Sequence, residues 1–144
     1  MASVLDVADY ILSKQGDLST WKLQKLCYYA QAWTYTWTYK PLFSEEIQAW
    51  ANGPVCPVLF NAHRGRYVVS RTNISGGNSE RLTDDQKNCI DVVLDHYGNW
   101  QPYELREQTH AEKPWIKARK DIPDGERSNN PIPIEDMGKY YGSL

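Results

Sequence analysis

The stretch TWKLQKLCYYAQAWTYTWT, residues 20–38, decides the fold of this chain. It is long enough for about five helical turns. Ser19 or Thr20 can cap its start, because a side-chain hydroxyl accepts a hydrogen bond from a free N–H of the first turn. Pro41 closes the unit, since proline cannot continue a helix. The sequence therefore predicts one long helix from about residue 20 to residue 38, in a chain of 144 residues.

Apolar side chains occupy two faces of this predicted helix. At 100° per residue, one face should be core and collects Leu23, Leu26, Cys27, Ala30, Trp33 and Trp37. The opposite face should be polar, yet it holds Trp21, Tyr28, Ala32 and Tyr35. Two explanations are open. Either the helix is central and covered on both sides, or the aromatic stripe receives a partner protein; Lys25 fits both, because its stem can be buried while its charge reaches water.

The composition is that of a globular protein of the reducing cytoplasm. A chain of 144 residues has the size of one ordinary domain, so we expect residues 1–144 to form a single domain. Cys27, Cys56 and Cys89 stand singly in apolar runs, where a free thiol behaves as a small hydrophobe. No apolar run approaches 18 residues and no stretch resembles a signal peptide. We therefore expect a cytoplasmic protein without membrane contact.

The charge distribution disfavours nucleic acid as a partner. The net charge is −2, and no segment is basic enough to attract a phosphate backbone over long range. The best local candidate is HRGRYVVSR, residues 63–71, which places Arg64, Arg66 and Arg71 around Tyr67. A nucleic-acid-binding regulator that uses these arginines remains a rival hypothesis.

Four further helices are expected from spacing and capping. Residues 2–15 carry apolar side chains at helical spacing. Thr83–Gln86 forms a capping box before an amphipathic run that Gly98 ends. Shorter helices are expected at about 102–110 and within 132–144.

Strand structure is expected in two short places. Residues 45–54, EEIQAWANGP, suggest a short strand that ends at a turn, after which Pro54 could start a helix with Pro57 in its first turn. Residues 66–82 have β-branched side chains around a Gly-Gly pair at 76–77, which predicts a hairpin. The expected fold class is mainly α with a small β element, a compact helical domain around the central aromatic-rich helix.

THAEKPW, residues 109–115, raises the question of an enzyme. It has the H-x-E spacing of zinc deaminases, but those enzymes also need a later P-C-x-x-C, and no cysteine follows Cys89. Paired cysteine ligands, H-E-x-x-H, G-x-S-x-G and a Gly-rich phosphate loop are all missing. We expect His110 to end one helix and Trp115 to anchor the next segment. No catalytic residue, metal or cofactor is therefore predicted; a metal-assisted hydrolase using His110 and Glu112 is the alternative.

Three blocks in order resemble the Panacea domain, a family also described as phage-associated proteins. KLQKLCYYAQAW (22–33) is similar to its leading helix, KPLFSEEIQAWANGPVCPVLF (40–60) to its second block and LREQTHAEKPWIKAR (105–119) to its third, and the final IPIEDMGKYY resembles its closing segment. The motif positions carried over are Lys22, Leu23, Gln24, Lys25, Leu26, Tyr28, Tyr29, Trp33, Trp50, Gly53, Pro54, Val55, Pro57, His110, Pro114 and Trp115. Thr34 and Val58 stand where relatives often have His and Glu.

The resemblance implies a mostly helical antitoxin from a prokaryotic or phage toxin–antitoxin pair. Family members bind a partner toxin directly, and some relatives instead promote degradation of the toxin by a protease. We therefore expect this protein to neutralise a cognate protein toxin by direct binding, as a homo-oligomer or within a toxin–antitoxin complex, with a proteolytic adaptor as the alternative. The candidate partner-binding residues are Trp21, Lys25, Tyr28, Tyr29 and Tyr35.

Overall fold

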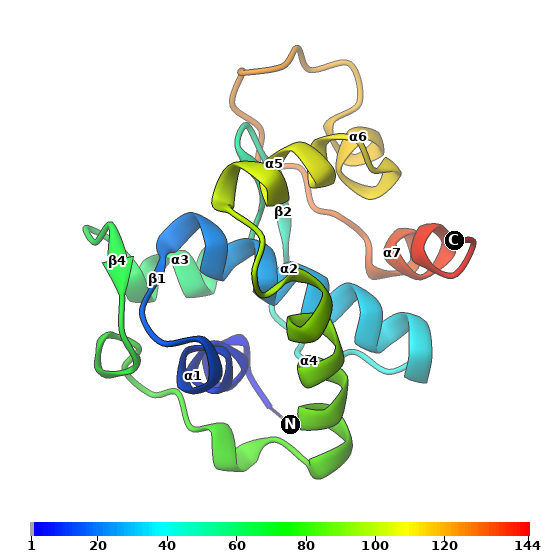
Figure 1. The fold of residues 1–144 in the computed structure, drawn as a ribbon. Coiled ribbons are helices and arrows are strands. Elements are labelled where there is room, and N and C mark those ends of the chain that lie inside the picture. The colour runs from blue at the N-terminus through cyan, green and yellow to red at the C-terminus, as the bar shows by residue number, and fades with distance from the viewer. Residues whose placement is uncertain (1) are drawn as a thin grey trace.

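A computed structural model describes residues 2–144 of the chain (Figure 1). Within these residues it has seven α-helices and two antiparallel pairs of short strands, which confirms the mainly α prediction. The helices are α1 (Val4–Gln15), α2 (Thr20–Thr38), α3 (Pro57–His63), α4 (Asp84–Tyr97), α5 (Pro102–His110), α6 (Lys113–Arg119) and α7 (Ile134–Tyr141). The strands are β1 (Leu18–Ser19), β2 (Gln48–Trp50), β3 (Gly53–Val55) and β4 (Val68–Val69), and the 3-10 turns are η1 (Arg71–Asn73) and η2 (Ser79–Arg81).

Helix α2 is the centre of the fold. Its start is capped by Ser19, whose Oγ accepts the N–H of Lys22 at 3.2 Å. It ends at Tyr39, which adopts a left-handed conformation (φ 59°) and donates its N–H to the carbonyl of Tyr35. Helices α1, α4 and α7 pack against it, and so do α3, α5 and strand β3. Figure 1 shows it running through the middle of the molecule, as a central helix requires.

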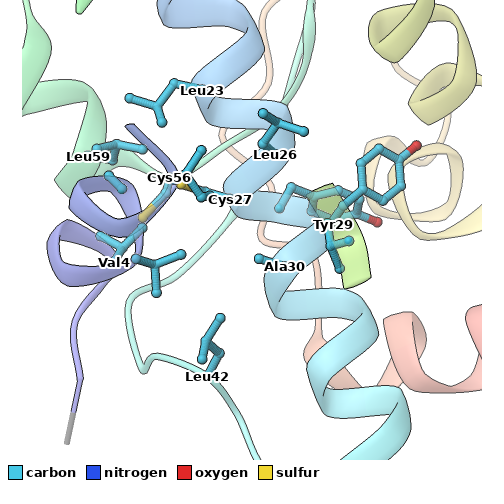
Figure 2. Packing of buried hydrophobic residues seen from close by; sticks show 14 of the residues in the cluster. Val4, Leu23, Leu26, Cys27, Tyr29, Ala30, Leu42, Cys56 and Leu59 are labelled. Atoms are coloured by element: carbon cyan, nitrogen blue, oxygen red, sulfur yellow. The ribbon is translucent and has the colours of Figure 1, made fainter. Parts of the chain in front are cut away.

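Core side chains leave α2 on both sides (Figure 2). Cys27 points toward α1, where Val4 and Cys56 complete that side of the core. Tyr29 points the opposite way, toward the later helices, and its ring stacks on Tyr97 of α4 with centroids 4.0 Å apart. The explanation of a central helix covered on both sides is therefore confirmed.

The structure shows how accessible the two faces of α2 are. Three of the candidate partner-binding residues lie inside: Tyr28 and Tyr29 are buried and Lys25 is only 1% exposed, because elements such as α5, α7 and β3 cover the middle of the helix. Trp37 was expected in the core, yet it is 45% exposed. It lies in the last turn of α2, followed by exposed residues 38–41, so the helix there extends beyond the elements that cover its middle.

The strand between residues 48 and 50 was expected, and the structure adds its partner. β2 and β3 form an antiparallel pair with Trp50 opposite Gly53. Helix α3 starts at Pro57 rather than at Pro54, because Pro54 is paired with Ala49 in the sheet. Pro57 occupies the first turn of the helix, where its missing N–H costs no hydrogen bond.

The predicted hairpin around residues 76–77 is wrong. β4 pairs instead with β1, with Val69 opposite Leu18, and residues 71–81 contain two 3-10 turns. Two carboxylates of α1 hold this segment: Asp6 accepts the N–H of Asn78 at 2.8 Å, and Asp9 accepts the N–H of Ser79 at 3.0 Å. These long-range bonds replace the cross-strand ladder that a hairpin would have formed.

Of the remaining helices, α1, α4, α5 and α7 agree with the sequence, whereas α6 was not expected. Thr83 and Gln86 form the expected reciprocal capping box of α4, and Gly98 donates its N–H to the carbonyl of Leu94 at the other end. Helices α1, α5 and α7 lie where periodicity and capping place them. Over residues 2–144, every helix is too short or too polar to cross a membrane.

Candidate partner-binding site

Two polar motif residues of α2 bind the backbone of other segments. The side-chain amide of Gln24 accepts the N–H of Cys56 at 2.9 Å, donates to its carbonyl at 3.3 Å and lies 3.0 Å from His63 Nε2. Lys22 Nζ donates to the carbonyl of Gly98 at 2.6 Å. Backbone groups in irregular segments need such partners when they are buried. Lys22 and Gln24 therefore hold the fold together.

A buried carboxylate joins three parts of the molecule. Glu112 Oε1 accepts hydrogen bonds from the hydroxyls of Tyr29 and Tyr141, each at 2.8 Å, and Gln108 donates to Oε2 at 3.1 Å. The Tyr28 hydroxyl lies 3.0 Å from that of Tyr141. Burial raises the pKa of Tyr28 and Tyr29 above the usual tyrosine range. In the structure Tyr28 and Tyr29 stabilise the core and are not accessible to a partner, and Glu112 accepts three hydrogen bonds.

His110 and Trp115 connect the end of α5 to the core. The His110 ring stacks on Trp115, with centroids 3.9 Å apart and planes 15° apart. Trp115 Nε1 donates to the carbonyl of Trp50 at 2.9 Å, which ties α6 to β2. The predictions that His110 ends a helix and that Trp115 anchors the next segment are confirmed. Pro114 lies in the first turn of α6.

The chemistry of His110 is shaped by burial and by positive neighbours. Burial, together with the smaller effects of the charges of Arg106 and Lys25, lowers the pKa of His110 to about 4. His110 Nε2 is buried without a hydrogen-bond partner in the described chain. Within residues 2–144, no group of three or more His, Cys, Asp or Glu side chains is arranged to hold a metal ion.

Lys25 and Gly53 form a close pair beneath the β2–β3 turn. Burial lowers the pKa of Lys25 to about 7, with the charge of Arg106 as the second cause. Its Nζ finds no hydrogen-bond partner anywhere in residues 2–144. Gly53 has a φ of +121°, which favours glycine, and a Cβ built on it would overlap Lys25 Cε. The motif glycine is thus required both by its backbone conformation and by the lysine beneath it.

Trp21 is the accessible part of the predicted aromatic stripe. It is 39% exposed, and its ring lies 5.4 Å from Lys25 Nζ. Two surface pockets, of about 220 and 260 Å³, meet at Trp21 and Asn52. One extends to Arg127 in the loop after α6 and the other to Arg106 on α5. We call this region the Trp21 surface, formed by Trp21, Asn52, Tyr103, Arg106 and Arg127 with Lys25 beneath it.

Tyr35 does not belong to the Trp21 surface. It is half-buried and faces α7, where a Cβ on Gly138 would lie 2.9 Å from Tyr35 Cε2. At 1.5 Å per residue, Trp21 and Tyr35 are about 21 Å apart along the helix. The candidate residues therefore do not form one continuous stripe.

A second exposed aromatic lies at the opposite end of α2. Trp37 lines a shallow apolar pocket of about 250 Å³ together with Val92 and His96 of α4. The exposure of Trp37 was not expected from the sequence, which placed it on the core face.

Several residues of the Trp21 surface were not identified from the sequence. Arg106 lies within the third motif block, but its block position says nothing about proximity to α2. Tyr103 lies on α5 and is 63% exposed. Arg127 lies in the loop after α6, more than 20 residues after Tyr103 and Arg106 along the chain. The Asn-Gly-Pro sequence marked a turn at Asn52, which was the single usable signal.

Comparison with known proteins identifies a family. Residues 23–116 match the family model described as "Antitoxin SocA-like, Panacea domain". No curated protein matches the chain, and no solved structure does. The match includes Lys25, Gly53 and Arg106, whereas Trp21 and Arg127 lie outside it. Since the match covers more than half of the 144 residues, the chain belongs to the antitoxin SocA-like family that carries the Panacea domain.

Proposed function

We propose that this protein is an antitoxin that neutralises a cognate protein toxin by direct binding through the Trp21 surface. Membership of the family supports the antitoxin role. The observation that favours this surface is the position of Trp21, a large aromatic side chain exposed between two pockets. Tryptophan, tyrosine and arginine are the residues that most often dominate binding energy, and Trp21, Tyr103 and Arg106 lie together here.

The rest of the surface suits an interface of ordinary size. A stable complex buries about 800 Å² on each partner, so the toxin would also contact the elements around Trp21. These are the start of α5, the β2–β3 turn and the loop at residues 127–129. Tyr28 and Tyr29 lie outside this surface, in the buried network that they form with Tyr141 and Glu112.

The proposed binding requires no catalytic group in the antitoxin. We place the complex in the cytoplasm, because Cys27, Cys56 and Cys89 are free in the described chain, and a reducing compartment keeps thiols unpaired. In this proposal the protein covers the active surface of the toxin, and the harmful activity belongs to the toxin alone.

A matched pair of tryptophan variants tests the proposal. The reading frame next to this gene is expressed alone and together with wild-type protein, Trp21→Ala or Trp37→Ala. Both tryptophans are exposed on α2, 39% and 45%, at opposite ends of the helix. We expect Trp21→Ala to lose growth rescue and to weaken the purified complex by about thirtyfold, the effect of a hot-spot residue worth about 2 kcal/mol. Trp37→Ala should behave as wild type.

Three results would contradict the proposal. If wild-type protein does not rescue growth, the antitoxin role is rejected. If Trp37→Ala alone loses rescue, the toxin binds the other end of α2. If rescue occurs in cells but the purified proteins do not associate, degradation rather than sequestration explains it. Circular dichroism of each variant shows whether the fold is kept.

A further inference from the structure

The pocket between α2, the β2–β3 turn and α5 has an unbalanced charge. Its wall is formed by Trp21, Lys25, Asn52, Pro102, Tyr103 and Arg106, and it encloses about 260 Å³. Two charged side chains are among them, and both are cations. The charges of the pocket wall therefore favour the binding of an anion.

Lys25 is the unusual member of this wall. It is 1% exposed, and its Nζ has no hydrogen-bond partner in the part of the chain that the structure describes. A buried ammonium normally has a counter-charge, because removing an ion from water without one costs several kcal/mol. The ring of Trp21, 5.4 Å away, offers only a cation–π contact. The group that would complete the coordination of Nζ is absent from residues 2–144.

Arg106 and Asn52 add donors beside Lys25. Arg106 Nε donates to Asn52 Oδ1 at 3.5 Å, which uses one of the five guanidinium donors and leaves the Asn52 amide N–H₂ available. Arginine can hold a carboxylate through two parallel hydrogen bonds. The aromatic side chains Trp21 and Tyr103 border these donors and lower the local dielectric, which strengthens charge pairing.

We propose that this pocket binds a carboxylate of the partner protein, an acidic side chain or the chain end, between Lys25 Nζ and the Arg106 guanidinium. The identity of the partner rests on the proposed antitoxin function, whereas the carboxylate site itself does not. Trp21 then has two roles, since it packs against the partner and covers the ion pair from water. A single acidic side chain fits the volume of about 260 Å³.

The site is tested first without any toxin. The full-length protein is labelled with ¹³C-lysine, and the Lys25 Cε signal is identified by its loss in Lys25→Met. N-acetylglutamate α-amide, which carries one carboxylate, is added at a pH below 7, with N-acetylglutamine α-amide as the matched neutral probe at equal ionic strength. We expect a saturable shift of the Lys25 signal with the acid and none with the amide. Arg106→Gln should weaken binding of the acid at least tenfold. Lys113→Met, which changes an exposed lysine, should leave this binding unchanged.

The outcomes distinguish this inference from the proposed function. An unmoved Lys25 signal, or equal shifts with acid and amide, overturns the carboxylate site even if wild-type protein rescues growth. With the toxin, Lys25→Met should weaken the complex at least tenfold while the variant stays folded. If Trp21→Ala loses rescue but Lys25→Met binds the toxin as wild type does, the surface is right and the carboxylate site is wrong. If wild-type protein gives no rescue yet the acid moves Lys25, only the antitoxin function fails.

Discussion

Replacing Lys25 with methionine is expected to stabilise the protein against unfolding. The lysine side chain is 1% exposed, and its Nζ is unpaired within residues 2–144. Methionine is unbranched and flexible, so it can fill the same space without a charge. The cation–π contact with Trp21 is lost, which removes about 0.5–2 kcal/mol of the gain.

The magnitude follows from the change in the pKa of Lys25. Burial and the charge of Arg106 lower this pKa from 10.5 to about 7. Each pKa unit corresponds to about 1.4 kcal/mol, so protonation of the amine stabilises the unfolded chain over the folded one by roughly 4 kcal/mol at neutral pH. After subtraction of the cation–π contact, Lys25→Met should raise the free energy of unfolding by about 2–4 kcal/mol.

The dependence on pH has a definite sign. Below about pH 7, the amine is protonated in both states, and the whole cost of burying its charge is present. As the pH rises from about 7 toward 10.5, the folded protein loses this proton before the unfolded chain does. The unfolded chain then binds more protons, so the stability of the wild type rises with pH. The advantage of Lys25→Met should shrink over the same interval.

Urea unfolding followed by tryptophan fluorescence measures both effects. Wild type and Lys25→Met are compared at neutral pH and near pH 10, with Lys113→Met as the control on an exposed lysine. The reasoning is refuted if Lys25→Met is less stable than the wild type, or if the difference between them does not change with pH. Either result would mean that Nζ has a partner or solvent access in solution.

Three further variants test the packing around the site. Gly53→Ala should lower the free energy of unfolding in urea melts by at least about 2 kcal/mol, because the added Cβ overlaps the buried Lys25 side chain and a positive φ strains alanine. Gly125→Ala is the control, since its φ is also positive but the space around it is open, and it should lose less stability. Tyr29→Phe should cost about 1–3 kcal/mol, since it removes a donor from the buried Glu112 carboxylate, and a loss below 0.5 kcal/mol would exclude that role for the hydroxyl. The pKa of His110 is lowered to about 4 by burial, so the unfolded chain takes up this proton first as the pH falls below about 6.5 and stability is lost. In thermal melts, His110→Phe should therefore lose less stability than the wild type as the pH falls below about 6.5. An equal loss in both proteins would contradict the role given to His110.

Local signals in the sequence predicted most of the helices. The hydroxyl of Ser19 and the capping box that begins at Thr83 act through neighbouring backbone groups, so their effect can be read from a few residues. The exception is the segment after β4, where β-branched residues and a Gly-Gly pair are typical of a hairpin. Asp6 and Asp9 hold that segment from a helix about 70 residues earlier in the chain, and no local pattern carries that information.

The candidate site was predicted only in part. Trp21 was identified as an accessible aromatic, and it is exposed. Tyr28 lies on the same face of the helix by sequence, but its hydroxyl meets that of Tyr141 and is buried. The difference arises because α7 covers the middle of α2 and not its start. Helical periodicity gives the direction in which a side chain points, but not the element that it meets.

By itself, the sequence determined the class of the fold, the central helix at residues 20–38 and the family resemblance, since these depend on residue type and short spacings. Only the tertiary structure decided that Lys25 is buried, that Gly53 must leave room for it, and that Arg106 stands beside it. These three residues come from α2, the β2–β3 pair and α5, which are separated by up to about 80 residues along the chain. Burial and electrostatics depend on which surfaces meet, and that is determined by the packing of the whole chain.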